Sequence, residues 1–139
     1  MVLNQATYYA MKISLFLAKQ DNNHVVEASA IYTSESIPKR FFFKIIGDLT
    51  KSGIVKSIRG RNGGFILGRK AEDINFYNII EAMEGPITLS PCLLNFSKCN
   101  NTTEYCIMHK KLEDSRNELI HNFESINLKF LIENKNLSS

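Results

Sequence analysis

All three cysteines of the chain lie in one short segment with regular spacing. Six residues separate Cys92 from Cys99, six separate Cys99 from Cys106, and His109 follows Cys106 after two residues. Thiolates and imidazole nitrogens are the usual protein ligands of zinc, copper(I) and iron–sulfur clusters. Because Cys106 and His109 are three positions apart, they would share one face of a helix and reach a common centre. The segment is therefore a candidate metal or cluster site.

Other interpretations of this segment stay open. The cysteines could be unrelated thiols, a disulfide with one thiol left over, or a structural Cys₃His zinc site. Structural zinc sites favour cysteines separated by two to four residues, whereas the gaps here are six residues long, which favours a cluster. An enzyme could also use Cys106 as nucleophile and His109 as base. The sequence contains no nucleophile elbow, orienting acid or α/β pattern to accompany that pair, so we expect no enzyme.

Basic residues concentrate between Pro38 and Lys70. This window contains nine lysines and arginines and one acid, Asp48, although the net charge of the whole chain is only +3. Such a local charge suits a polyanion, and nucleic acid is the obvious one. A solvated basic surface is the alternative.

The basic window begins in a predicted helix-turn-helix. Apolar residues at helical spacing predict helices over residues 5–19, 27–36 and 74–84, and a third helix that starts at Pro38 and stops at Gly53. The apolar face of that third helix consists of Phe42, Ile45, Ile46 and Leu49. A second stripe consists of Arg40, Phe43, Lys44, Gly47 and Lys51. A short helix, a turn and a helix with a basic outer stripe match the motif whose second helix enters the major groove.

A hairpin is predicted directly after this motif. Two β-prone runs, 54–59 and 65–67, flank the turn sequence GRNGG. The hairpin would form the wing of a winged helix, with Arg59 and Arg61 near a slim tip that fits a narrow minor groove. An ordinary surface hairpin is the alternative.

A long amphipathic helix is predicted from about Ile107 to Glu133. Its apolar seam consists of Leu112, Leu119, Phe123, Ile126 and Phe130. Heptad-like spacing of this kind is typical of a helix that pairs with a partner helix. The helix could instead fold back on its own domain. We expect a homodimer, because operators are commonly two-fold.

Taken in order, these features resemble a known family. The helix-turn-helix, the wing segment IRGRNGGFILGR, the three-cysteine loop and the terminal helix are similar to winged-helix iron–sulfur transcription regulators, which include IscR, NsrR and RirA. The resemblance extends over almost the whole chain, from LNQATYYAMK onward. It implies a homodimeric regulator with one cluster per subunit, held beside the dimer helix. IscR-like members hold a 2Fe–2S cluster with three cysteines and a histidine, which implies Cys92, Cys99, Cys106 and His109 as ligands.

Two departures from the family pattern refine this expectation. NsrR-like members hold a 4Fe–4S cluster with the help of an N-terminal acid of the partner subunit, and the segment NQATYYAMK contains no acid. The resemblance therefore favours 2Fe–2S, with 4Fe–4S as the alternative. Phe43 stands where relatives often carry a polar or acidic side chain, and its ring could contact thymine methyl groups.

We therefore predict a mainly α fold. It would consist of a winged helix-turn-helix DNA-binding domain (residues 1–85), a cluster-binding loop (86–109) and a dimerisation helix with a short tail (110–139). The predicted DNA-binding residues are Lys39, Arg40, Phe43, Lys44, Lys51, Arg59 and Arg61. The longest apolar runs are too short to span a membrane, and the N-terminus does not have the features of a signal peptide, so we expect a cytoplasmic protein.

The predicted function is sequence-specific regulation of promoters through binding to double-stranded DNA, as a repressor or as an activator. An iron–sulfur cluster would control promoter binding, and the response would concern cluster biogenesis or a related iron or redox signal. The alternatives are a nitric-oxide or iron sensor with a 4Fe–4S cluster, and a zinc-stabilised or cofactor-free regulator of the same fold.

Overall fold

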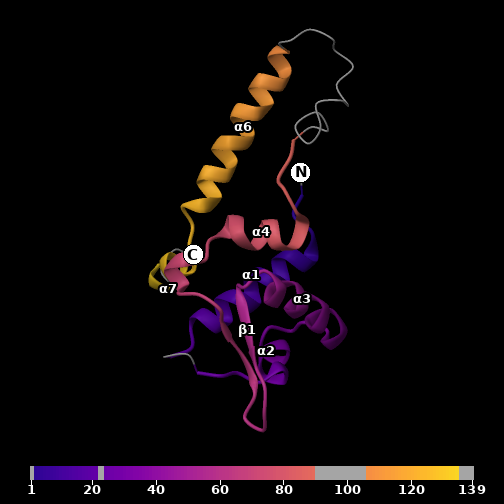
Figure 1. Ribbon diagram of the computed structural model, residues 1–139, viewed down its shortest axis with the longest axis vertical. Coiled ribbons are helices and arrows are strands. Elements are labelled where there is room, and N and C mark those ends of the chain that lie inside the picture. The colour runs from indigo at the N-terminus through magenta and orange to yellow at the C-terminus, as the bar shows by residue number, and fades with distance from the viewer. Residues whose placement is uncertain (1, 22–23, 90–105, 135–139) are drawn as a thin grey trace.

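The computed structural model describes residues 2–21, 24–89 and 106–134. In chain order its elements are α1 (Gln5–Ala18), α2 (Ala28–Ser34), α3 (Lys39–Lys51), β1 (Val55–Ile58), β2 (Gly64–Leu67), the 3₁₀ turn η1 (Ala71–Asp73), α4 (Phe76–Glu84), α6 (Ile107–Glu124) and α7 (Leu128–Glu133). Figure 1 shows α1, α3 and α4 gathered at the centre, the β1–β2 hairpin at one end, and α6 projecting from the other. The mainly α winged helix-turn-helix fold predicted from the sequence is confirmed.

The core forms where the apolar faces of α1, α3 and α4 meet. The predicted inner face of α3 is correct, because Phe42 and Leu49 are fully buried and Ile45 and Ile46 nearly so. From α1, Ala10, Ile13 and Leu17 fill the same core, at the spacing expected for one side of a helix.

The turn between α2 and α3 is fixed against α1. Lys12 Nζ donates a hydrogen bond of 2.8 Å to the carbonyl oxygen of Glu35. Ser36 adopts a positive φ of 54°, and the buried side chain of Ile37 follows. Pro38 then precedes the first residue of α3 with a φ of −57° that suits the start of a helix. These contacts fix the orientation of the start of α3 relative to α1 and α2.

The hairpin is antiparallel and pairs Val55 with Leu67 and Ile58 with Gly64. Val26, from the segment before α2, joins its edge, since Val26 and Phe65 exchange backbone hydrogen bonds of 3.0 and 2.8 Å. A Cβ at Gly64 would lie 2.3 Å from the carbonyl oxygen of Val26, so only glycine allows this approach. The wing is therefore held to the segment before α2 at the end of β2 that adjoins the turn, and the turn itself extends away from the core (Figure 1).

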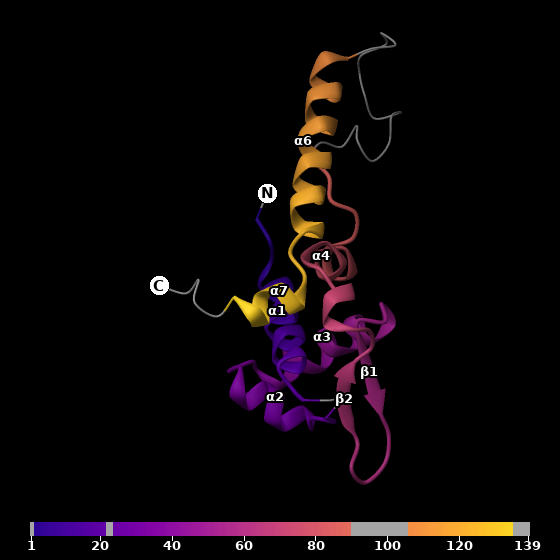
Figure 2. The same ribbon diagram turned by 90° about the vertical axis from the view of Figure 1, so that its left-hand side faces the viewer.

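The predicted uninterrupted helix from Ile107 to Glu133 is wrong. α6 ends at Glu124, and Asn127 caps a separate helix, α7, by accepting a hydrogen bond from the backbone N–H of Phe130. Between the two helices, Phe76 N donates to Ile126 O and Leu128 N donates to Ile74 O, both at 2.9 Å. Figure 2 shows the result, with α7 turned back beside α1.

The apolar seam proposed from the sequence is correspondingly shorter. Leu112, Leu119 and Phe123 lie on α6, whereas Ile126 lies in the connection and Phe130 on α7. The heptad-like spacing therefore continues beyond the end of α6, into the connection and α7. Only its first part can serve a partner helix.

The anchoring of α7 gives a prediction for stability. Leu128 is 1% exposed and belongs to the core of the winged domain. Leu128→Ala should lower the free energy of unfolding by about 2–5 kcal/mol, because it removes a buried side chain and leaves a cavity. Urea unfolding of chelator-treated protein at fixed concentration measures this loss. Phe130→Ala, on the same helix but at a side chain 44% exposed, is the control and should cost much less. Equal losses would contradict the docking of α7.

Candidate nucleic-acid interface and cofactor segment

The outer stripe of α3 is basic and accessible. Arg40, Lys44 and Lys51 are exposed, as is Lys39 in the first turn. The ion pairs found within the described ranges involve Lys12, Lys110 and Lys129, which lie on other elements. The positive charge of α3 is therefore available to an external anion.

The turn of the wing carries a second group of basic side chains. Arg59 and Arg61 are exposed in the turn that joins β1 to β2, as predicted. The turn is tight, since Gly63 N donates to Gly60 O at 3.0 Å and Gly60 has a φ of 114°. The two arginines therefore sit on a narrow tip beyond the sheet, in a position separate from α3.

Phe43 lies at the border of the basic stripe of α3 and is 48% exposed. Its ring contacts two others, Phe42 on the same helix and Tyr32 on α2. Tyr32 does not belong to the basic or apolar faces of α3 that the sequence predicts. Only the packing of α2 against α3 brings Tyr32 to Phe43, so a local sequence pattern could not have found it.

Two of the four predicted cluster ligands can be placed. Cys106 is the N-cap residue of α6 and His109 lies in its first turn, and both side chains are half-buried. Cys92 and Cys99 lie outside the described residues. Within the described residues, no group of three or more histidine, cysteine or acidic side chains is arranged to hold a metal ion.

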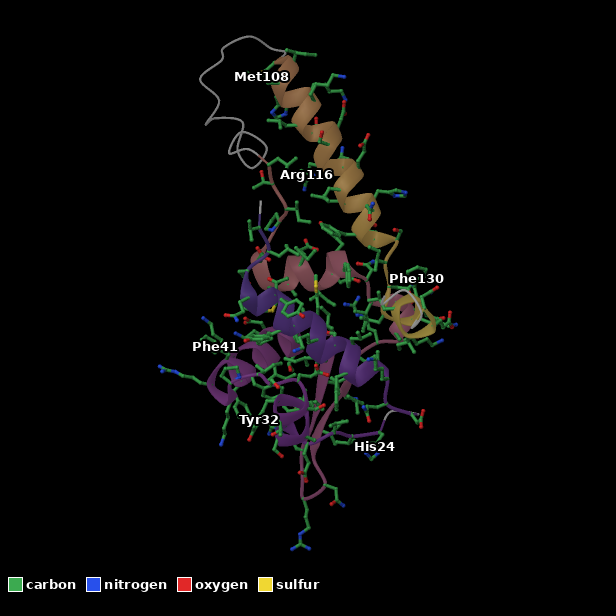
Figure 3. All side chains as sticks on the ribbon, turned by 180° about the vertical axis from the view of Figure 1, so that it is seen from behind. His24, Tyr32, Phe41, Met108, Arg116 and Phe130 are labelled. Carbon is green, nitrogen blue, oxygen red and sulfur yellow. The ribbon has the colours of Figure 1, made fainter. Side chains whose placement is uncertain are left out.

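The Cys106–His109 end of α6 is remote from the wing. Met108, labelled in Figure 3, marks this end, and the hairpin lies at the opposite end of the molecule. Further along α6, Arg116 Nε donates a hydrogen bond to the carbonyl oxygen of Ile87, whose side chain is buried. This bond ties α6 to the segment that leads into the cysteine region. Sequence reasoning missed Arg116, because its partner lies 29 positions away and shares no motif with it.

The N-terminal end of α6 is covered by little of its own chain. No side chain of this helix is fully buried within the part of the chain that the structure describes. Ile107 and Met108 are 61% and 69% exposed.

None of the described helices is long and apolar enough to cross a membrane.

Comparisons with known proteins agree on one family. Residues 3–134 match the Rrf2 family, described as an iron-dependent transcriptional regulator. The HTH-type transcriptional regulator NsrR of Bacillus licheniformis is 36% identical over 108 residues, which cover 78% of this chain and 71% of that protein. An HTH-type transcriptional regulator of Aquifex aeolicus is 30% identical over 133 residues, which cover 95% of this chain and 92% of that one.

Solved structures support the same fold. IscR of T. potens superposes with a TM-score of 0.78 at 21% identity, over 100% of this chain and 92% of that one. CymR, the global cysteine regulator of B. subtilis, superposes with a TM-score of 0.75 at 23% identity, over 94% and 95%. The relatives found by sequence are named as transcriptional regulators, so the chain is a DNA-binding regulator and not an enzyme. It belongs to the Rrf2 family of winged-helix transcriptional regulators.

Proposed function

We propose that this protein binds promoter DNA as a homodimer and that an iron–sulfur cluster, of the 2Fe–2S type, sets its affinity. Cys92, Cys99, Cys106 and His109 would be the ligands, within a cluster-binding segment over residues 86–109. The observation that carries the proposal is that Cys106 and His109 lie together at the N-terminal end of α6, as the N-cap residue and in the first turn. The regulated genes would serve cluster biogenesis or a related iron or redox response, with repression as the mode of control.

The donor set fits an iron–sulfur cluster. Three thiolates and one imidazole are soft and borderline ligands. Both placed ligands are half-buried, so they are accessible without unfolding the helix. A bound iron–sulfur cluster would connect its ligands to one another. Its presence and oxidation state would depend on iron supply and redox conditions. Histidine adds sensitivity to protons, because the ring nitrogen must be unprotonated to bind metal.

The path from this segment to DNA would be α6 itself. The N-terminal end of α6, which carries Cys106 and His109, lies at the opposite end of the molecule from the hairpin, so these residues would not act on DNA by contacting it at the wing (Figure 1). The far end of α6 leads directly into Ile126, whose carbonyl is hydrogen-bonded to α4, and into α7, which packs on α1. Arg116 holds the middle of the helix to Ile87. A change in how the ligands are held would therefore tilt α6 against the winged domain.

The homodimer proposal rests on the half-buried seam of α6. Leu112, Leu119 and Phe123 recur at intervals of seven and four residues on a helix that its own domain leaves largely uncovered. Pairing two such helices would bury these side chains and set the separation of the two α3 helices. We place dimerisation within the predicted region 110–139, in α6 rather than α7.

On the DNA side we propose a division of labour. Arg40 and Lys44 would reach base edges from the first two turns of α3, and Arg59 and Arg61 would enter the flanking minor groove. Lys39 and Lys51, near the two ends of the helix, would contact phosphates, and Phe43 would border the bases. The exposure of all these side chains supports the assignment.

This division predicts different losses for two α3 variants. Lys51→Ala should weaken binding to operator and random DNA alike and reduce the salt slope by about one charge, because phosphate contacts carry no sequence information. Arg40→Ala should cost about 1–3 kcal/mol on operator DNA and relax sequence choice. Fluorescence anisotropy at several salt concentrations measures both. Lys19→Ala, at the exposed C-cap residue of α1, is the control. Equal losses on both DNAs for Arg40→Ala would remove it from base readout.

His109→Ala should shorten the lifetime of the cluster and alter its visible spectrum while the fold survives. The side chain is half-buried at a helix end, so its removal leaves the core intact. Anaerobic absorption spectra and the decay of the chromophore in air measure the effect. His121→Ala, at an exposed position on the same helix, is the matched control. An unchanged spectrum and lifetime in His109→Ala would exclude it as a ligand.

The direct test of the proposed function is anaerobic purification followed by iron and sulfide counts. We expect red-brown protein with about two irons and two sulfides per subunit, and operator affinity that changes when a chelator removes the iron. Colourless protein containing zinc would instead indicate a zinc-stabilised regulator. If the protein contains iron but its operator affinity stays the same after a chelator removes that iron, the sensor role is contradicted.

A 4Fe–4S regulator is the second candidate, favoured by the 36% identity to NsrR of Bacillus licheniformis. About four irons per subunit in the same measurement would decide for it. NsrR-like members carry an acid in their N-terminal segment. The corresponding segment of this chain, around Tyr8, contains no acid, and we therefore favour a 2Fe–2S cluster.

A further inference from the structure

Gly47 occupies the middle of α3, where glycine is unfavourable. Its greater freedom in the unfolded chain destabilises a helix by about 0.5–1 kcal/mol relative to alanine. Its φ is not in the positive range that favours glycine, and a Cβ built on it would meet nothing within 4 Å. The packing of the domain therefore does not require the absence of a side chain. Gly47 lies on the outer stripe that faces DNA, so the open space belongs to that face.

Phe43 lies one turn before Gly47 and borders the same space, because residues four apart are neighbours on a helix surface. Its ring packs edge-on against Phe42 at 5.4 Å between centroids and lies 6.5 Å from the ring of Tyr32. Phe42 is fully buried and contacts Phe65 of β2 at 6.1 Å. The ring of Phe43 thus contacts Phe42 of α3 and Tyr32 of α2 directly, and 48% of the residue remains exposed.

The surroundings of this ring are basic. Arg40 and Lys44 flank Phe43 on the outer stripe, and both are exposed. The charged neighbours bring a polyanion to this face, whereas the ring itself offers only apolar contact. In the major groove the one apolar group on a base edge is the 5-methyl group of thymine.

We propose that Phe43 and Gly47 together form a notch that receives a thymine methyl group, so that the protein reads thymine at one position of each half-site. The ring supplies the apolar wall, and the missing side chain at Gly47 supplies the room. This inference rests on the DNA-binding function and deepens it, by naming the base feature and the two residues that read it.

The test uses duplexes that differ by single methyl groups. Full-length protein, both anaerobically purified and chelator-treated, first selects its preferred duplex from a randomised library. Each thymine of that duplex is then replaced by uracil, which pairs identically but lacks the methyl group. One symmetry-related pair of thymines should stand out, with a loss of about fourfold per half-site, the factor expected for burial of one methyl-sized group.

Two variants should change this preference in different ways. Phe43→Leu should lower the preference for thymine over uracil, because the smaller side chain makes less contact. Gly47→Ala should remove or reverse it, because the added methyl fills the notch and uracil relieves the clash. Gly47→Ala should also raise the melting temperature, since alanine favours helix. Higher stability with weaker binding to thymine duplexes excludes misfolding as the cause.

Phe41→Leu is the matched control. Phe41 is 52% exposed on the same helix but, two residues before Phe43, points about 200° away around the helix axis. Its replacement should leave the thymine preference unchanged. The inference is overturned if no uracil position weakens the wild-type protein, or if Gly47→Ala keeps the wild-type preference. Failure to select any duplex would overturn the DNA-binding proposal as well, so the two failures are distinguishable.

Discussion

Leu112→Asp should convert the protein from dimers to monomers and weaken its binding to a two-fold operator by about 10²- to 10⁴-fold, the gain that linking two binding modules provides. Leu112 is half-buried in the N-terminal half of α6, and this helix projects away from the winged domain (Figure 1). A carboxylate there would be buried against the partner helix without a counter-charge, which is strongly unfavourable. Analytical ultracentrifugation and operator binding measure the two effects.

The control for this prediction introduces the same carboxylate elsewhere on α6. Asn117→Asp lies five positions later, is exposed, and sits about 140° away around the helix. It should remain dimeric and bind the operator normally. Binding of a single half-site should be similar for Leu112→Asp and the wild type, because α3 and the wing are untouched. A dimeric Leu112→Asp protein would place the subunit contact elsewhere.

Cys106→Ala should abolish the chromophore and reduce iron to background, while the winged domain stays folded. Removing one of the four proposed ligands would leave an open coordination position that solvent can attack. The change is mild for the helix, because the Cys106 side chain makes no capping hydrogen bond to α6. Alanine is preferable to serine, whose hydroxyl would introduce a cap and stabilise the helix.

Operator affinity in Cys106→Ala should equal that of chelator-treated wild type and stop responding to chelator or oxygen. Iron analysis, circular dichroism and anisotropy titrations together provide the measurement. Ile107→Ala, at the neighbouring position and 61% exposed, should retain iron and its response. Full iron content in Cys106→Ala would show that the ligands lie elsewhere. Iron loss without any change in DNA binding would leave a cluster with no regulatory role.

Much of the winged domain could be predicted because its elements carry local signals. The apolar face of α3 repeats at helical spacing, Pro38 and Gly53 mark its ends, and GRNGG marks the hairpin turn. Each signal depends on residues within a few positions of one another, so the sequence alone reveals it. The exposure of Arg40, Lys44 and Arg59 followed from the same reasoning.

The C-terminal region could not be predicted in this way. An apolar spacing of seven, four, three and four residues describes one helix equally well as two helices joined by a short connection. The break arises because Ile126 and Leu128 pair with the backbone around α4, about fifty residues earlier in the chain. Asn127 adds a cap, but asparagine is also common on exposed helix surfaces and is a weak signal alone.

The sequence by itself determined the classes of chemistry in this protein: a basic helix and wing that suit DNA, and a set of sulfur and nitrogen donors that suits a metal centre. Only the tertiary structure decided that α7 returns to the core, that Arg116 ties α6 to Ile87, and that Phe43 rests on Tyr32 and Phe42 beside the open space at Gly47. The physical reason is that side-chain type and short-range periodicity can be read from residues that are close together in the sequence. Contacts between distant segments depend instead on how whole elements pack.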